Sequence, residues 1–167
     1  MNSISYINNL SKDEFCNIFG NVFEKTAWIS EKIYELKPFL NFDSLHKSFL
    51  DIYEKCTNEE YLEIFNSHPQ LAIEKIITKN SLNEQNQAKL YSCTKKELEE
   101  FTKLNQEYKK RFKFPFIITV SGLNKIDILD NFRRRINRNF VEEFEEAKIQ
   151  VKKIGIIRLN QILDKKK

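Results

Sequence analysis

Three polar residues have side chains and positions that could act on a small molecule: His68, Glu84 and Arg158. An imidazole transfers protons near neutral pH, and a carboxylate can orient a polar group or exchange a proton. A guanidinium can hold an anion through two parallel hydrogen bonds. Together they would suit acid–base chemistry on a small anionic substrate. Each also has a purely structural interpretation, so each has to be considered in its own sequence context.

His68 lies in the segment FNSHPQLA, residues 65–72, directly before Pro69. Proline disfavours helical geometry in the residue before it, so we expect a helix to end just before His68. The imidazole would then sit at a kink with limited conformational freedom. This position suits a side chain directed into a pocket, and it suits a helix terminator equally well.

Glu84 follows Ser81 at the spacing of a capping box, in which a hydroxyl and a carboxylate satisfy free amides in the first turn of a helix. The same pattern occurs at Ser11 to Glu14, Thr57 to Glu60 and Thr94 to Glu97. Four such boxes predict four helix starts. Glu84 is therefore either a helix cap or a carboxylate available for chemistry.

Arg158 continues the apolar stripe of a long predicted helix. The stripe steps by three or four residues through Phe140, Phe144, Ala147, Val151 and Ile154. A guanidinium on such a face must find an anion or several acceptors, because leaving it buried and unpaired costs several kcal/mol. We expect its partner to be either an internal carboxylate or a carboxylate or carbonyl of a ligand.

The elements that must position these residues are predicted to be helices. Glycine and proline are scarce, at three each in 167 residues, which favours helices joined by short polar links. Two long helices should contain residues 98–112 and 140–154, and shorter ones are expected near 11–19, 26–36, 42–56, 58–66, 70–78, 81–92 and 124–136. We predict an all-α, multi-helix fold that forms a single domain over residues 1–167.

One segment breaks the helical pattern. KFPFIITVSG, residues 113–122, is aromatic and β-branched around a proline and ends in glycine, which predicts an extended conformation. The sequence offers no second strand to pair with it. Its backbone amides and carbonyls must therefore be satisfied by a polar ligand, by helix ends or by ordered water.

Charge and composition limit the class of function. The net charge of +4 is mild, and the basic cluster Arg133, Arg134, Arg135 and Arg138 would spread over more than half of a helix circumference, as on a solvated surface. No dense row of aromatic residues accompanies the cluster, so nucleic-acid binding is not favoured.

Several other classes have no support in the sequence. Cys16, Cys56 and Cys93 are isolated, so neither a disulfide framework nor a metal site is expected. There is no glycine-rich phosphate loop and no H-E-x-x-H motif. No run of about 18 to 20 apolar residues and no secretory signal is present, and we expect a cytoplasmic protein without a membrane span.

Several segments, taken in order, resemble the 2-oxo-4-hydroxy-4-carboxy-5-ureidoimidazoline (OHCU) decarboxylase family. They are FGNVFEKTAWISEKI, HPQLA, SLNEQNQAKL, LNQEYKKRFKFPFIITVSG and EEFEEAKIQVKKIGIIRLNQIL, and they span roughly residues 9–163. The His-Pro pair, S-x-x-E-Q and F-P-F are the most specific parts. The resemblance implies an all-helical homodimer that converts OHCU, a small anionic ureide, to (S)-allantoin in urate degradation, without a cofactor.

The resemblance also implies roles for individual residues. His68 matches the family's catalytic histidine, and we assign Glu84 to catalysis with it. Arg158 matches an arginine of the last helix. Substrate-binding roles are implied for Pro69, Ser81, Leu82, Asn83, Gln85, Phe116, Ile117, Ile118, Thr119, Val120 and Arg158.

The sequence departs from the usual family pattern at four positions. Ile73 and Glu74 stand in HPQLAIEK where the family usually has HPxLAGK, Lys89 replaces a glycine in AKL, and Ser121 stands where many members carry an arginine. These changes bear on which ureide is bound. Two alternatives therefore remain: a non-catalytic helical module that binds a ligand or protein, and a decarboxylase-like enzyme for a related ureide.

Overall fold

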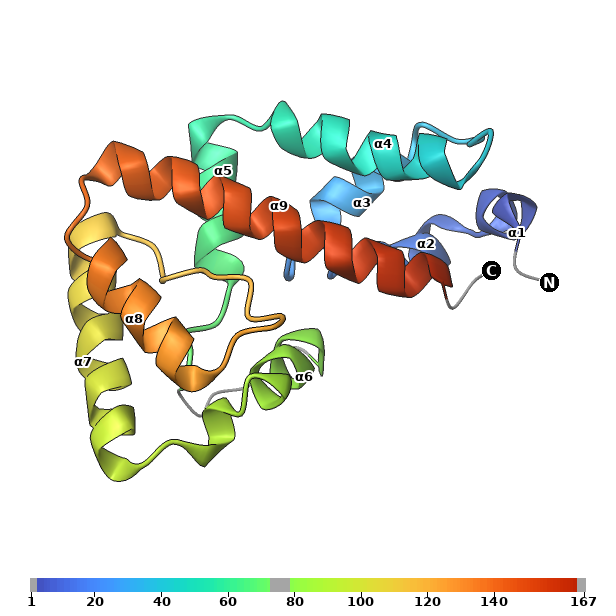
Figure 1. Cartoon of the computed structure of the whole chain (residues 1–167). Coiled ribbons are helices and arrows are strands. Elements are labelled where there is room, and N and C mark those ends of the chain that lie inside the picture. The colour runs from blue at the N-terminus through green and yellow to red at the C-terminus, as the bar shows by residue number, and fades with distance from the viewer. Residues whose placement is uncertain (1–2, 73–78, 165–167) are drawn as a thin grey trace. The chain divides into compact units, whose positions relative to one another are not determined.

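The computed structural model describes residues 3–72 and 79–164, which form helices and loops and contain no β-strand (Figure 1). The prediction of an all-α fold is confirmed. The chain divides into two compact units, residues 1–67 with 152–167 and residues 68–151. None of the helices described combines the length and the apolar character that a bilayer crossing requires.

The first unit is built from short helices around an aromatic core. The helices are α1 (Ile4–Asn9), α2 (Lys12–Phe19), α3 (Ala27–Tyr34), α4 (Phe42–Glu54), α5 (Asn58–Ser67) and the C-terminal part of α9 (Phe140–Asp164). Phe23 stacks on Tyr53 with ring centroids 4.6 Å apart. Phe23 also packs so closely against Gly155 of α9 that a Cβ at position 155 would lie 2.3 Å from its ring. The glycine is therefore required for this close approach.

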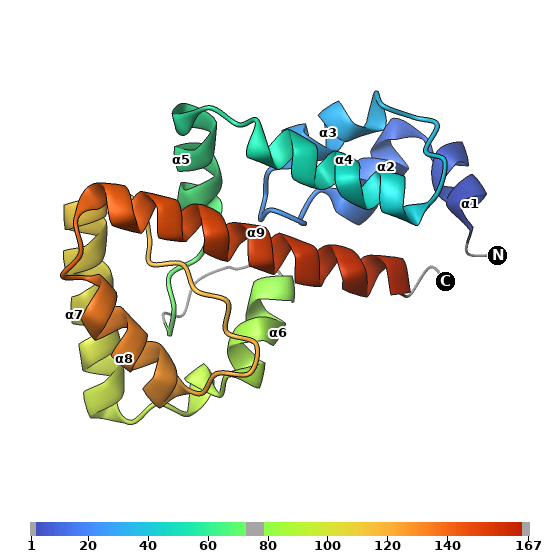
Figure 2. The same cartoon turned by 45° about the horizontal axis from the view of Figure 1, so that its top comes forward.

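The second unit contains α6 (Lys79–Gln87), a 3₁₀ turn (Leu90–Ser92), α7 (Lys95–Phe112), α8 (Lys125–Arg135) and the first part of α9. Helices α7 and α8 lie side by side in both views (Figures 1 and 2). The segment between them carries Phe116, whose ring stacks on Phe132 of α8 with centroids 3.9 Å apart. The prediction of an extended segment without a partner strand agrees with the irregular backbone of residues 113–120.

Side-chain caps define most of the helix starts. The predicted capping boxes at Ser11 and Thr94 are confirmed, and Thr57 and Glu60 exchange the same two hydrogen bonds. Three asparagine caps, which the sequence reasoning missed, play the equivalent role at Asn41, Asn124 and Asn139.

Two predictions about residues 81–92 were wrong. Helix α6 begins at Lys79, so Ser81 lies inside the helix and does not cap it. The helix ends at Gln87, and Lys89 then adopts a left-handed conformation with φ of 56°. A residue with this backbone conformation cannot continue a right-handed helix, and a separate 3₁₀ turn follows.

Residues 4–9 and 71–72 also differ from the predicted helices. Helix α1 was not predicted. A helix was expected at residues 70–78, but residues 71–72 form a turn. Residues 73–78 lie outside the described residues, and so do the departures at Ile73 and Glu74.

Candidate active site

His68 lies where the sequence placed it, immediately after the last residue of α5, Ser67. The imidazole residue is buried, with 8% of its surface exposed. Pro69 and Gln70 continue the chain into a turn, in which Ala72 has a left-handed backbone with φ of 54°. A buried imidazole on a sharply turned segment needs support from neighbouring elements.

Two side-chain amides supply that support. Gln85 of α6 donates from Nε2 to the carbonyl of Gln70 at 3.4 Å and accepts at Oε1 from the N–H of Ala72 at 3.2 Å. Asn105 of α7 donates from Nδ2 to the carbonyl of Leu71 at 3.0 Å. Both amides are buried. Three consecutive residues of the turn are thus held by uncharged groups from two helices.

Asn105 was missed by the sequence reasoning. It lies four residues after Phe101 and three before Tyr108, on the apolar stripe of α7. A polar residue on a buried stripe usually has a hydrogen-bonding role, because an unpaired polar group there is costly. That pattern was the available signal.

The predicted residues of α6 differ in exposure. Ser81 and Gln85 are one helical turn apart and both are buried, while Glu84 is half-buried beside them. Leu82 and Asn83 are exposed. The hydroxyl of Ser81 and the carboxamide of Gln85 therefore lie on the inner face of α6, and the carboxylate of Glu84 lies at the border of that face.

The extended segment is held by side chains from α8 and α9. Residues 116–120 are buried except for Thr119, which is half-buried. Arg135 donates from Nη1 to the carbonyl of Ile117 at 2.9 Å. Gln150 accepts at Oε1 from the N–H of Thr119 at 2.8 Å. Two of the backbone groups that needed a partner are thus satisfied by side chains.

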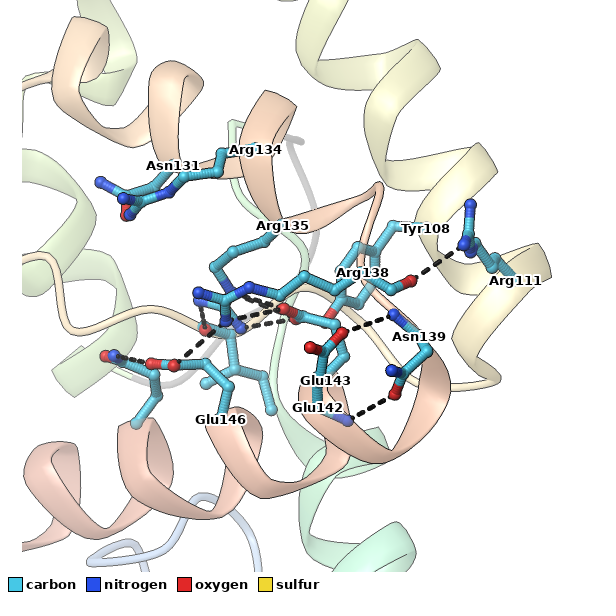
Figure 3. A network of polar contacts seen from close by, with 12 residues as sticks. Tyr108, Arg111, Asn131, Arg134, Arg135, Arg138, Asn139, Glu142, Glu143 and Glu146 are labelled. Carbon is cyan, nitrogen blue, oxygen red and sulfur yellow. Dashed lines mark hydrogen bonds and ion pairs between the residues drawn. The ribbon is translucent and has the colours of Figure 1, made fainter.

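A buried ion pair joins α8 and α9 (Figure 3). Arg135 of α8 and Glu143 of α9 are 2% and 0% exposed at their side chains, and Nη2 lies 2.9 Å from Oε2. Tyr108 of α7 donates its hydroxyl to the same carboxylate. Burial and the hydrogen bond to Glu143 raise the pKa of Tyr108, so the phenol remains a donor.

The network continues along α9. Arg138 donates from Nη1 to Glu143 at 3.3 Å and to Glu146 at 3.2 Å, and Gln150 donates from Nε2 to Glu146 at 2.7 Å. Burial disfavours the ionised carboxylate of Glu146. The hydrogen bond from Gln150 and the charges of Arg135 and Arg138 outweigh that effect and hold the pKa of Glu146 below its ordinary value.

The interpretation of the arginine cluster as a solvated surface was wrong for Arg135. Arg133 and Arg134 are exposed, but Arg135 lies three residues after Phe132 and seven after Ile128, which are both buried. These spacings put Arg135 on the inner face of α8. The run of three arginines concealed this position.

Arg158 belongs to the other unit, where it has an internal carboxylate as partner. Its Nη1 lies 2.8 Å from Oε2 of Glu24 and 3.0 Å from the carbonyl of Asn21. Both side chains of the ion pair are buried. The expected internal carboxylate partner of Arg158 is therefore confirmed, and its role as a substrate ligand stays a prediction.

Residues 8–160 match the OHCU decarboxylase family. This chain belongs to the OHCU decarboxylase family. It is 31% identical to the OHCU decarboxylase of Haloferax volcanii over 94% of both chains. It is also 31% identical to that of Xenopus laevis, covering 93% of this chain and 91% of the relative.

Another relative is longer. The chain is 35% identical to the uric acid degradation bifunctional protein of Bacillus sp. (strain TB-90), covering 97% of this chain but 32% of that protein. The chain thus spans about a third of the length of this relative.

Solved structures share the fold. A crystal structure of (S)-allantoin synthase matches with a TM-score of 0.76 and 25% identity, over 96% of this chain and 53% of the other. A crystal structure of OHCU decarboxylase in the presence of (S)-allantoin matches with a TM-score of 0.73 over 86% of this chain and 96% of the other. At 23% identity, the second likeness bears on the fold alone.

Within this OHCU decarboxylase family member, the structure brings two family motifs together. The turn after the His-Pro pair is hydrogen-bonded to the glutamine of the S-x-x-E-Q segment, although 15 residues separate Gln70 from Gln85. The F-P-F segment lies in the same unit. The roles of the individual residues stay predictions.

Proposed function

We propose that this protein decarboxylates OHCU to (S)-allantoin, a step of urate degradation, without a cofactor. The observation that carries the proposal is the buried His68 turn, hydrogen-bonded to Gln85 of the S-x-x-E-Q helix. Membership of the OHCU decarboxylase family over residues 8–160 supports the assignment of this arrangement to that reaction.

The chemistry of the substrate makes the reaction feasible for ordinary side chains. In OHCU the carboxylate shares a ring carbon with a hydroxyl, and that carbon is bonded to the imine carbon of the ring. When the bond from the ring carbon to the carboxylate breaks, CO₂ leaves. The electron pair of that bond stays on the ring and spreads into the adjacent unsaturation. The substrate is therefore its own electron sink, and the protein has to bind it, orient it and deliver a proton.

We assign the proton transfer to His68. A buried imidazole on a fixed turn would reach only one face of the ring, so the proton would be delivered there and set the handedness of allantoin. Glu84, at the border of the inner face of α6, would orient the hydroxyl or ureido group. Pro69, Ser81, Leu82, Asn83, Gln85 and residues 116–120 are the proposed substrate-binding positions.

Arg158 stays a predicted substrate ligand from the family resemblance alone. Its pairing with Glu24 gives it a structural role in its own unit. Arg158→Lys would keep the charge but lose the planar fork. Unchanged turnover in that variant would leave Arg158 with the structural role only.

The proposal is tested by circular dichroism of freshly generated OHCU as allantoin forms. Wild-type protein should give one enantiomer rapidly, and His68→Ala should lower kcat by about 10²- to 10⁴-fold, the usual contribution of a positioned acid or base. His46→Ala, at the only other histidine, is the matched control and should behave as wild type.

The possible outcomes separate the candidate functions. If OHCU in the presence of wild-type protein decays only at the slow spontaneous rate and gives racemic allantoin, the decarboxylase assignment fails. A non-catalytic module or an enzyme for a related ureide would then be the better explanation. Normal turnover by His68→Ala would leave the decarboxylase assignment intact but would show that His68 is not the proton donor.

We also propose that the protein is a cytoplasmic homodimer. The family resemblance supports the homodimer. Light scattering coupled to size-exclusion chromatography should give a mass of about twice the 20.0 kDa of the chain, and a mass equal to one chain would contradict the dimer.

A further inference from the structure

We infer that Arg135 and Gln150 are positioning residues for this reaction, which fix two consecutive peptide groups so that the N–H and carbonyl of Ile118 face the substrate. The inference rests on the proposed function and deepens it. Neither residue belongs to the His-Pro, S-x-x-E-Q or F-P-F motifs.

Arg135 fixes the first peptide group. Its Nε and Nη2 are occupied by Glu143, and the remaining Nη1 donates to the carbonyl of Ile117 at 2.9 Å. The guanidinium also lies over the ring of Phe116, 4.4 Å from its centroid. In a planar trans peptide the carbonyl and the following N–H point in opposite directions. The N–H of Ile118 therefore points away from Arg135.

Gln150 fixes the next peptide group in the same way. It accepts the N–H of Thr119 at Oε1, so the carbonyl of Ile118 points away from Gln150. The carboxamide cannot flip without loss, because its Nε2 donates to Glu146 at 2.7 Å. Glu146 is linked through Arg138 to Glu143, the partner of Arg135. The two contacts to the extended segment thus belong to one network.

Ile118 is left with unused hydrogen-bonding capacity. The residue is 7% exposed, and no hydrogen bond in the described part of the chain involves its N–H or its carbonyl. Buried backbone groups are nearly always paired. A neighbouring donor and acceptor complement the N–H and C=O of a cyclic ureide, which can form two hydrogen bonds at once. Ile118 therefore offers a recognition site for this chemical class.

The first test uses the stable product (S)-allantoin as the probe. In ¹H–¹⁵N spectra of wild-type protein, the amide of Ile118 should shift on titration with (S)-allantoin. Thr119, whose N–H is occupied by Gln150, should shift less. This readout reports a contact at Ile118, which a merely structural role of the segment would not produce.

The second test uses Gln150→Ala, with Gln106→Ala as the matched control. Gln106 is an exposed glutamine of α7. Loss of the Thr119 contact should let the peptide group rotate, and kcat/KM for OHCU should fall about 10- to 100-fold, mainly through KM. Gln150 and Thr119 are both half-buried, so water can replace part of the lost contact and the thermal midpoint should fall only slightly. Gln106→Ala should leave both parameters unchanged.

Arg135→Lys provides an independent variant. Lysine keeps a positive charge for Glu143 but cannot serve both that carboxylate and the carbonyl of Ile117 with a fixed fork. KM should rise in this variant as well. If Arg135→Lys fails to fold, Gln150→Ala still decides the question.

The outcomes are distinguishable from failure of the proposed function. Binding of (S)-allantoin without a shift at Ile118, or an unchanged KM in Gln150→Ala, would overturn the inference while the decarboxylase activity stands. If wild-type protein neither binds (S)-allantoin nor forms it, the proposed function fails and the inference falls with it.

Discussion

Two parts of the candidate active site are supported by different physical means. The turn after His68 is held by the uncharged amides of Gln85 and Asn105, each through one or two hydrogen bonds. The extended segment is held by a buried ionic network centred on Arg135 and Glu143. Amide hydrogen bonds do not respond to acid, whereas a carboxylate network does. The two supports should therefore fail under different conditions and at different cost.

The largest expected effect comes from breaking the buried ion pair on one side. Glu143→Leu alone should lower the free energy of unfolding by about 3–5 kcal/mol, because it leaves the buried charge of Arg135 without its carboxylate. Arg135→Met should cost less, because Glu143 keeps its contacts to Arg138 and Tyr108. The double variant should recover most of that loss. Denaturant unfolding measures all three, and single variants that cost less than about 1 kcal/mol would show that water reaches the pair.

A smaller effect is expected for the neutral support. Asn105→Ala removes the donor to the carbonyl of Leu71 and should cost about 1–3 kcal/mol, the range for a buried hydrogen-bonding partner left unsatisfied. Turnover should fall as well, since the turn carries His68. Asn160→Ala, at an exposed position of α9, is the control. A loss as large as that of Glu143→Leu would remove the contrast between the two supports.

Acid should act on the ionic support first. The pKa of Glu146 is lower in the folded protein than its ordinary value of 4.5, so as the pH falls protons bind the unfolded chain more readily. The stabilisation by Glu146 is complete above pH 4.5 and is lost as the pH drops through the lower folded value.

Hydrogen exchange between pH 6 and pH 3 should show this difference. Protection of the Thr119 amide should decline in wild type, and Glu146→Gln should flatten that decline. The Ala72 amide, which is bound to neutral Gln85, should show no matching loss. A decline at Ala72 of the same size would indicate that acid opens the whole unit.

The smallest effect is expected where charge is present without burial. Arg133 contacts Glu100 at 2.6 Å, but the two side chains are 49% and 35% exposed. Glu100→Gln should therefore change the free energy of unfolding by less than about 1 kcal/mol. A much larger change would mean that charge alone, independent of burial, explains the strength of the Arg135–Glu143 pair.

The sequence was informative wherever one residue type dominates a local choice. Serine and threonine caps at Ser11 and Thr94 were found because a hydroxyl and a glutamate recur at a fixed spacing. The pattern failed at Ser81, where α6 starts two residues earlier. The sequence also does not predict the left-handed conformation of Lys89, because glycine is the usual residue with this conformation after a helix end.

Buried polar residues were harder to predict, and the two buried arginines show why. Arg158 stands alone on an apolar stripe, so its need for a carboxylate was evident, although Glu24 lies 134 residues away and could not be named. Arg135 stands in a run of three arginines, and only its spacing from Phe132 distinguishes it. The tertiary partner of a charge is set by the packing of helices, which local periodicity does not contain.

The extended segment has a consequence for the unfolded chain. Residues 116–121, FIITVS, are rich in β-branched and aromatic side chains and carry no charge, the composition of segments that stack into intermolecular sheets. In the folded protein, Arg135 and Gln150 occupy backbone groups that a neighbouring strand would otherwise use. The network that shapes the candidate site also keeps this aggregation-prone segment from pairing with other chains. Variants that lose the network should precipitate on heating under conditions in which wild type refolds.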